Sequence, residues 1–346
     1  MTIQGYPDPG DGLRLHLNEN TGGCSPRVLE AIRRIQTADV STYPSYPALV
    51  RACAAHFGVD PDWVLLTNGL DEGILMAAVG HIARARAFDA ETIIPLPAFD
   101  PYPNSTAAVG ATAVRIPPRP GFAFQTDEVI QAITPRTRMI FLNTPNNPTG
   151  QLITVPDLKR IAGAAPGAVV LIDEAYIEFG GETFLPELRN YPNVLVGRTF
   201  SKAYGLAGMR VGILIGQPQS LDAVRLVTLP FNINGVAMAA TLAALEDREF
   251  LPRYAAQVVE SRTRLHAACR SLGLECWTSS ANFVLVRVGD AVSLFVEALA
   301  ARGVHVRDRS KDSTTPGCIR ITAGMLDHTD AAIEALESVV AGRQAR

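Results

Sequence analysis

Four side chains that could act together on a small anionic molecule lie close to one another in the chain: Thr199, Ser201, Lys202 and Arg210. They follow an apolar run, residues 194–196, that predicts a buried strand. A lysine just after a buried strand is poorly solvated, which lowers its pKa and leaves a neutral amine able to attack a carbonyl. The segment therefore indicates Schiff-base chemistry. The alternative is an ordinary surface lysine whose stem covers apolar surface.

Three more polar clusters follow predicted strands at residues 63–66, 138–142 and 168–172. The first leads through a glycine turn at Gly69 into a predicted helix, where free backbone N–H groups suit a phosphate. The second enters the amide-rich turn N-T-P-N-N-P-T-G, and the third ends in D-E-A-Y from Asp173. Each cluster has a plain turn as its alternative, but their shared position after strands favours one common site.

The elements that position these clusters alternate as strand, helix, strand from residue 63 to 215. This order predicts an α/β fold: a mostly parallel mixed sheet flanked by helices, with ligands at the carboxyl ends of its strands. From residue 234 the pattern changes to helices at 235–245, 248–272 and 292–302, with strands at 282–288, 304–308 and 318–322. We expect residues 36–247 to form the large domain and residues 248–346 a smaller α+β domain. Residues 1–35, an arm and a first helix capped by Ser25, are expected to pack with the small domain.

Composition narrows the class of function. The chain has 346 residues, 47% of them hydrophobic, and a net charge of −3 without a basic run, so nucleic acid and anionic membranes are not expected partners. Its five cysteines form no metal-ligand spacing with the histidines, so no metal is expected. The first residues lack the features of a signal peptide and no run is apolar enough for a membrane span, which predicts a cytoplasmic protein.

Six motifs follow one another along the chain: Y-P at 43, G-L-D-E at 69, P-N-N-P-T-G at 145, D-E-A-Y at 173, T-F-S-K at 199 and R-V-G at 210. With them the chain resembles pyridoxal-phosphate (PLP) enzymes of the fold type I aminotransferase superfamily, and within it is similar to histidinol-phosphate aminotransferases. The likeness runs over nearly the whole length, from L-H-L-N-E-N to C-I-R-I-T-A-G.

The resemblance implies a role for each matching residue. Lys202 would form the Schiff base with PLP, Asp173 would pair with the ring nitrogen, and Tyr176 would hold the ring hydroxyl together with Asn147. The phosphate would be bound by the backbone of Gly69, Leu70 and Asp71 and by Thr199, Ser201 and Arg210. Tyr102 would stack on the ring, and Tyr43 would reach the phosphate from the partner subunit of a homodimer with shared active sites. The residues expected to bind substrate are Arg320, Arg307 and Asn20.

The resemblance also implies the reaction. Histidinol phosphate would donate its amino group and 2-oxoglutarate would accept it, in a ping-pong reaction of histidine biosynthesis in which Lys202 is the base. Three alternatives stay open: an aromatic amino acid aminotransferase, a PLP-dependent decarboxylase or lyase of the threonine-phosphate decarboxylase type, and a non-catalytic PLP-binding sensor. The substrate is the open point because the family's N-E-N-P is here Asn18-Glu19-Asn20-Thr21, and the arm, with Tyr6 its only tyrosine, is short.

Overall fold

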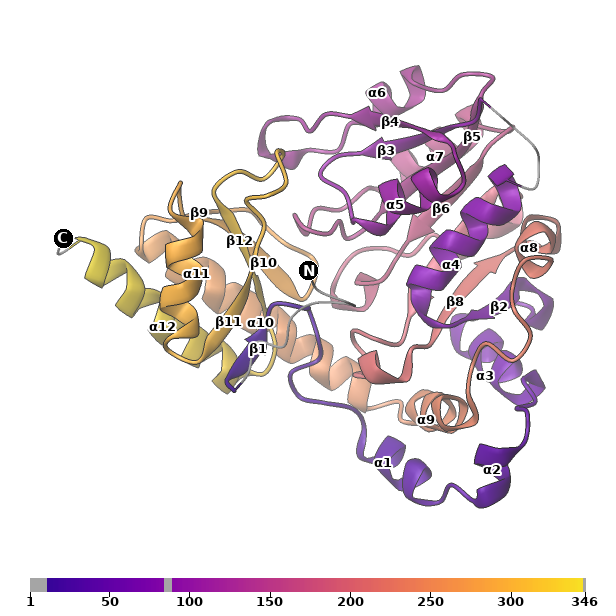
Figure 1. Ribbon diagram of the computed structural model, residues 1–346, viewed down its shortest axis with the longest axis horizontal. Coiled ribbons are helices and arrows are strands. Elements are labelled where there is room, and N and C mark those ends of the chain that lie inside the picture. The colour runs from indigo at the N-terminus through magenta and orange to yellow at the C-terminus, as the bar shows by residue number, and fades with distance from the viewer. Residues whose placement is uncertain (1–10, 84–88, 345–346) are drawn as a thin grey trace.

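The computed structural model describes residues 11–83 and 89–344. Two β-sheets organise them: a large sheet flanked by helices and a small sheet with the long C-terminal helices beside it (Figure 1). The predicted α/β class is confirmed. Tyr6 and the rest of residues 1–10 of the expected arm lie outside the described residues.

The large sheet has the order β2-β8-β7-β6-β5-β3-β4. Its strands are β2 (Val64–Thr67), β3 (Glu91–Pro95), β4 (Thr112–Ile116), β5 (Thr137–Asn143), β6 (Val169–Asp173), β7 (Val194–Thr199) and β8 (Gly212–Gly216). All neighbouring pairs are parallel except those made by β8, which runs antiparallel to β7 and β2. Strands β6 and β7 are buried along their whole length, as expected for central strands covered on both faces.

The helices that accompany this sheet are α1 (Pro26–Arg33), α2 (Thr37–Ser41), α3 (Pro47–Phe57), α4 (Gly69–Ala78), α5 (Pro101–Ala108), α6 (Thr126–Gln131), α7 (Val155–Ala164), α8 (Pro218–Arg225) and α9 (Gly235–Glu246). A π-helical turn, Val79–Ala83, continues α4. Helix α4 begins at Gly69 itself, whereas the sequence predicts a turn there that leads into the helix. The glycine turn and the helix N-terminus are therefore the same place.

The small sheet has the order β1-β11-β12-β10-β9. Its strands are β1 (Leu13–Leu15), β9 (Glu275–Cys276), β10 (Phe283–Arg287), β11 (Val304–Asp308) and β12 (Cys318–Thr322), and its helices are α10 (Phe250–Ser271), α11 (Val292–Ala300) and α12 (Leu326–Gln344). Short 3₁₀ turns lie at Pro61–Trp63, Pro120–Phe122, Ile177–Phe179, Leu185–Asn190 and Ala207–Met209.

The N-terminal segment divides between the two parts of the molecule. Strand β1 pairs in parallel with β11 of the small sheet. Helix α1, however, packs against α9, which the predicted division assigns to the large domain. Ser25 caps α1 as expected, because its side chain accepts a hydrogen bond from the Arg27 N–H. The arm thus joins the small sheet through its strand, and its helix lies elsewhere.

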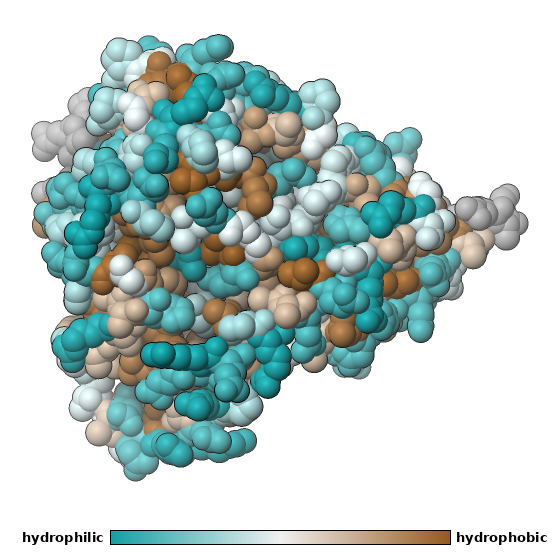
Figure 2. All heavy atoms as spheres, turned by 180° about the vertical axis from the view of Figure 1, so that it is seen from behind, coloured by the Kyte–Doolittle hydropathy of each residue, from teal (hydrophilic) through white to brown (hydrophobic). Residues whose placement is uncertain are grey.

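The surface is mixed in character. On the face seen in Figure 2, hydrophobic residues form separate groups between hydrophilic ones. Among the described residues, no helix combines the length and the apolar character that a membrane span requires.

Candidate active site

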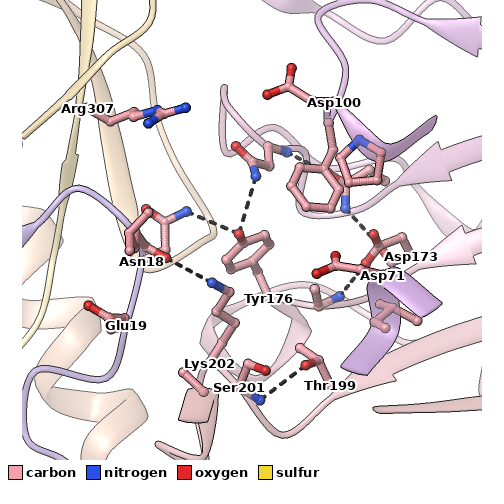
Figure 3. Close-up of a pocket in the computed structure, with 18 of the residues that line it drawn as sticks. Asn18, Glu19, Asp71, Asp100, Asp173, Tyr176, Thr199, Ser201, Lys202 and Arg307 are labelled. Atoms are coloured by element: carbon pink, nitrogen blue, oxygen red, sulfur yellow. Dashed lines mark hydrogen bonds between the residues drawn. The ribbon is translucent and has the colours of Figure 1, made fainter. Parts of the chain in front are cut away.

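A cavity of about 310 Å³ lies between the two sheets. Its walls come from the carboxyl ends of β5, β6 and β7, the first turn of α4, the arm after β1, and strands β11 and β12. Parallel strands bring their carboxyl ends to one edge of a sheet, so this is where the polar clusters were expected to meet. Figure 3 shows the side chains around this cavity, including Lys202, Asp173 and Tyr176.

Lys202 extends into the cavity from the segment after β7. Its Nζ donates a hydrogen bond to the Leu17 carbonyl of the arm at 2.9 Å and lies 5.9 Å from the centre of the Tyr176 ring. Burial lowers the pKa of Lys202 to about 8, and the positive charge of Arg320 acts in the same direction. About a tenth of the Lys202 amine is therefore neutral at pH 7, and about half at pH 8.

Asp173 ends β6 and is almost completely buried. Its carboxylate accepts hydrogen bonds from the Tyr102 hydroxyl at 2.7 Å and the Ala175 N–H at 2.9 Å. Burial raises the pKa of Asp173 to about 6, against the effect of these two bonds. Among the ion pairs of the described residues none includes Asp173, so its charge has only neutral donors around it.

Tyr102 does not line the cavity. Its ring is buried against Phe141, with ring centroids 5.0 Å apart, and its hydroxyl serves Asp173. The expected stacking of Tyr102 on a bound ring is therefore wrong for this geometry. Phe99, three positions earlier, lines the cavity and packs edge-on against Tyr102.

Tyr176 and Asn147 come together as expected. The Tyr176 hydroxyl accepts hydrogen bonds from the side-chain amides of Asn18 at 3.1 Å and Asn147 at 3.4 Å. Burial raises the pKa of Tyr176, so the phenol stays protonated near neutral pH. Its proton is thus available for an oxygen of a bound ring.

Asn20, expected to bind substrate, does not line the cavity. Its amide donates to the Ala203 carbonyl at 3.0 Å and its oxygen accepts from the Gly22 N–H at 2.9 Å, so both ends hold the arm in place. Asn18 lines the cavity instead, at a positive φ of 57°. The sequence signal for Asn18 is its place in the motif L-H-L-N-E-N. The motif alone does not show that Asn18, and not Asn20, faces the cavity, because this depends on the backbone turn at Asn18.

The residues expected to bind a phosphate lie around the first turn of α4. The Asn68 side chain makes no capping hydrogen bond there. Ser201 accepts from Arg210 at 3.4 Å, and Arg210 also pairs with Asp71 at 3.2 Å. Gly69 has a φ of +75°, and a Cβ at this position would overlap the Arg210 guanidinium. The positive φ favours glycine here, and an added Cβ would displace the Arg210 guanidinium. Members of the expected set that line the cavity are Leu70, Asp71, Thr199, Ser201 and Arg210.

The opposite wall carries arginines. Arg320 on β12 is buried and donates from one end of its guanidinium to the Asn147 side-chain oxygen at 2.5 Å and from the other to the His16 carbonyl at 2.9 Å. Arg307 on β11 lies directly across from Arg320 in the strand pairing and also lines the cavity. Both arginines line the cavity, in agreement with the role in substrate binding that the resemblance implies for them.

Tyr43 lies away from the cavity of its own chain. Its side chain is 79% exposed and stacks on Phe231, with ring centroids 4.3 Å apart. This position is compatible with a contact to another subunit.

The cavity suits pyridoxal phosphate on three structural grounds. Asp173 is a buried carboxylate that lacks a cation and could receive a protonated ring nitrogen. Lys202 has the lowered pKa that attack on an aldehyde requires. The α4 turn, with Gly69 kept free of a side chain, offers backbone N–H groups to a phosphate beside Arg210.

Comparison with known proteins agrees with this arrangement. Residues 10–336 match the family described as aminotransferase class I and II. Histidinol-phosphate aminotransferase 2 of Ralstonia nicotianae is 39% identical over 350 aligned positions, which cover 96% of this chain and 90% of that protein. The aromatic amino acid aminotransferase of Cutibacterium acnes is 35% identical, with 98% of this chain and 96% of that protein covered.

A solved structure gives the same result at the level of the fold. Histidinol-phosphate aminotransferase from Sinorhizobium meliloti, in complex with pyridoxal-5'-phosphate, superposes with a TM-score of 0.84 at 26% sequence identity. The alignment covers 96% of this chain and 92% of that one.

Proposed function

The chain belongs to the class I and II aminotransferase family, whose chemistry depends on PLP, and we propose that its amino donor is histidinol phosphate and its acceptor 2-oxoglutarate. We choose histidinol phosphate as the amino donor because the Ralstonia nicotianae relative is named for that substrate. The arginine-lined wall of the cavity supports it, because guanidinium groups bind phosphates and carboxylates alike.

Each of the main cavity residues has a separate role in the proposed reaction. Bound PLP supplies an aldehyde and a protonated ring that accepts the electron pair left when a bond to the substrate Cα breaks. Asp173 keeps the proton on the ring nitrogen, and Tyr176 and Asn147 orient the ring through its hydroxyl. With PLP bound, the Lys202 amine would be the base that takes the proton from the substrate Cα. Arg320 fixes the anionic end of the substrate, so that the Cα–H bond faces Lys202.

The proposal includes a homodimer in which Tyr43 serves the partner's active site. The high exposure of Tyr43 supports this, as do the exposed hydrophobic side chains Val40, Leu226, Leu229 and Phe231. It also includes a cytoplasmic location, since phosphorylated substrates do not cross membranes unaided.

The test is a half-reaction without acceptor. We expect histidinol phosphate to convert the bound cofactor to its amino form within seconds, with one keto product formed per active site, and 2-oxoglutarate to restore the starting form. Release of carbon dioxide without any need for an oxo acid would instead identify a decarboxylase. Binding of PLP without turnover of any amino donor would identify a sensor.

One observation favours a second candidate, an aromatic amino acid aminotransferase. The Cutibacterium acnes relative bears that name, and a single carboxylate can occupy the same Arg320. Phenylalanine belongs in the same half-reaction assay. A larger kcat/KM for phenylalanine than for histidinol phosphate would replace the proposed donor and keep the mechanism.

A further inference from the structure

Three guanidinium groups line one wall of the cavity: Arg307, Arg309 and Arg320. Arg307 and Arg320 are opposite each other in the antiparallel pairing of β11 and β12. Arg309 follows Arg307 by two positions, and side chains two positions apart in an extended chain point to the same face. Like charges placed so close destabilise a sheet, so the wall is arranged for an anion.

Arg309 has a firm backbone position. Its N–H donates to the Cys318 carbonyl at 3.0 Å, and its carbonyl accepts from the Thr315 hydroxyl at 2.9 Å. The Asp312 N–H also donates to the Arg309 carbonyl, at 3.2 Å. The loop between β11 and β12 is therefore closed at this point by main-chain and hydroxyl bonds that do not involve the guanidinium.

The guanidinium itself is sparsely bonded. The side chain is about nine-tenths buried, and among the described residues its hydrogen bond is to the Asp312 carboxylate at 3.1 Å. Its Nε is buried without a hydrogen-bond partner in that same part of the chain. A buried arginine costs desolvation energy that one carboxylate neighbour only partly offsets.

Asp100 faces Arg309 across the cavity mouth. It precedes α5 on the large-sheet side, and its carboxylate lies 4.0 Å from an Arg309 nitrogen with 57% of its side chain exposed. Figure 3 shows Asp100 and Arg307 on opposite sides of the cavity. An ion pair this long and this exposed is weak, so a bound anion can take the place of Asp100 beside Arg309.

We propose that Arg309 is a specificity-determining residue that binds the second negative charge of a substrate whose first charge Arg320 holds. The proposal rests on the proposed function, which supplies two such substrates. Histidinol phosphate is a phosphate monoester with nearly two charges at pH 8, and 2-oxoglutarate is a dicarboxylate. Arg309 thus separates doubly charged substrates from amino acids that carry one carboxylate.

The experiment compares Arg309→Met and Arg309→Lys with the wild-type holoenzyme. Arg309→Met is expected to raise the KM for histidinol phosphate, for 2-oxoglutarate or for both by about 10- to 100-fold, and to leave the KM for phenylalanine within about twofold. The substrate whose KM rises identifies the anionic group that Arg309 binds. Arg309→Lys keeps the positive charge but lacks the planar guanidinium that can donate two parallel hydrogen bonds. Its KM values are expected to lie between those of wild type and of Arg309→Met.

Two further variants complete the design. Asp100→Asn removes the competing carboxylate and is expected to lower the affected KM by about two- to threefold. The control is Arg287→Met, which removes an arginine of β10 that pairs with Glu275 of the edge strand β9 and does not line the cavity. It is expected to change none of these constants.

A binding measurement keeps the outcome independent of the donor. Calorimetric titration of the holoenzyme with maleate, a dianion, and isocrotonate, its single-charge cis analogue, is expected to show a loss of affinity in Arg309→Met for maleate alone. Equal losses for both, or a lowered thermal midpoint with all KM values raised together, would reduce Arg309 to a structural residue. Unchanged maleate affinity together with unchanged KM values for both doubly charged substrates would overturn the proposal, whereas failure of wild type to use histidinol phosphate would remove only the donor.

Discussion

At the scale of single residues, burial moves the pKa values of the two central groups toward each other. The pKa of Lys202 is lowered to about 8 and that of Asp173 is raised to about 6, in both cases mainly by desolvation. Burial thus disfavours the charged form of both groups, and PLP, when bound, would interact with both. The lysine gains a carbonyl to attack, and the carboxylate gains a cation.

The Lys202 pKa predicts how the apoprotein takes up PLP. Only the neutral amine attacks an aldehyde, and its fraction rises with pH until the pKa is passed. At pH 8 about half of Lys202 is neutral, against roughly 0.3% for a lysine of ordinary pKa. We expect the uptake rate, followed by stopped-flow absorbance, to rise up to about pH 8 and to level off above it.

Free PLP also titrates in this range, so N-α-acetyl-lysine under the same conditions is the control. Its rate is expected to keep rising toward pH 10. The Lys202→Ala variant should show no covalent phase at any pH. An uptake rate that follows the acetyl-lysine curve throughout would mean that Lys202 is as solvated as a free side chain.

Residue types were easier to predict than the direction in which side chains point. Lys202, Asp173, Asn147 and Tyr176 meet at the cavity as the motifs indicate. The sequence analysis names Tyr102 and Asn20, whereas Phe99 and Asn18 line the cavity, because sequence spacing does not show which side chain of a turn faces inward.

At the scale of elements, the first turn of α4, which begins at Gly69, is the proposed phosphate site. Gly69→Ala is expected to weaken PLP binding by at least about tenfold, because the added methyl group meets the Arg210 guanidinium at a positive φ. Fluorescence titration of the apoprotein with PLP measures the effect.

The variant Gly58→Ala is the control that separates backbone strain from the steric overlap with Arg210. Gly58 has a similar φ of +68°, but nothing lies within 4 Å of the position its Cβ would take. Both variants should lose about 1 kcal/mol of stability from the left-handed backbone, and Gly58→Ala should bind PLP like wild type. Equal PLP affinity in the two variants would show that the Arg210 side chain moves away from the added methyl group without affecting PLP binding.

Elements with strong patterns were predicted closely, and short ones were not. Strands β11 and β12 have the predicted bounds, because their apolar alternation is bounded by Gly303 and Gly317. Helices α5, α6 and α8 were not predicted, since they are at most eight residues long and α5 and α8 begin with proline after a polar turn. Helix α12 starts at Leu326, four residues before its predicted start at 330.

At the scale of the whole molecule, the cavity depends on contacts between segments far apart in the chain. The Leu17 carbonyl of the arm accepts from Lys202, and the His16 carbonyl accepts from Arg320. The arm therefore ties the lysine of one part to the arginine of the other. No local pattern contains this information, because it arises only when β1 pairs with β11.

The proposed dimer gives the last prediction, which concerns the exposed Tyr43. If Tyr43 serves the partner's site, a heterodimer of one Tyr43→Ala subunit and one Lys202→Ala subunit has one intact site, made of Lys202 from the first and Tyr43 from the second. With two affinity tags to isolate it, this heterodimer should show about half of the wild-type activity at limiting PLP. Lys202→Ala homodimers should be inactive and Tyr43→Ala homodimers should need more PLP. A doubly tagged wild-type dimer is the control. If Tyr43 acts within its own chain, the heterodimer's remaining lysine lacks its tyrosine, and the PLP requirement will match that of Tyr43→Ala.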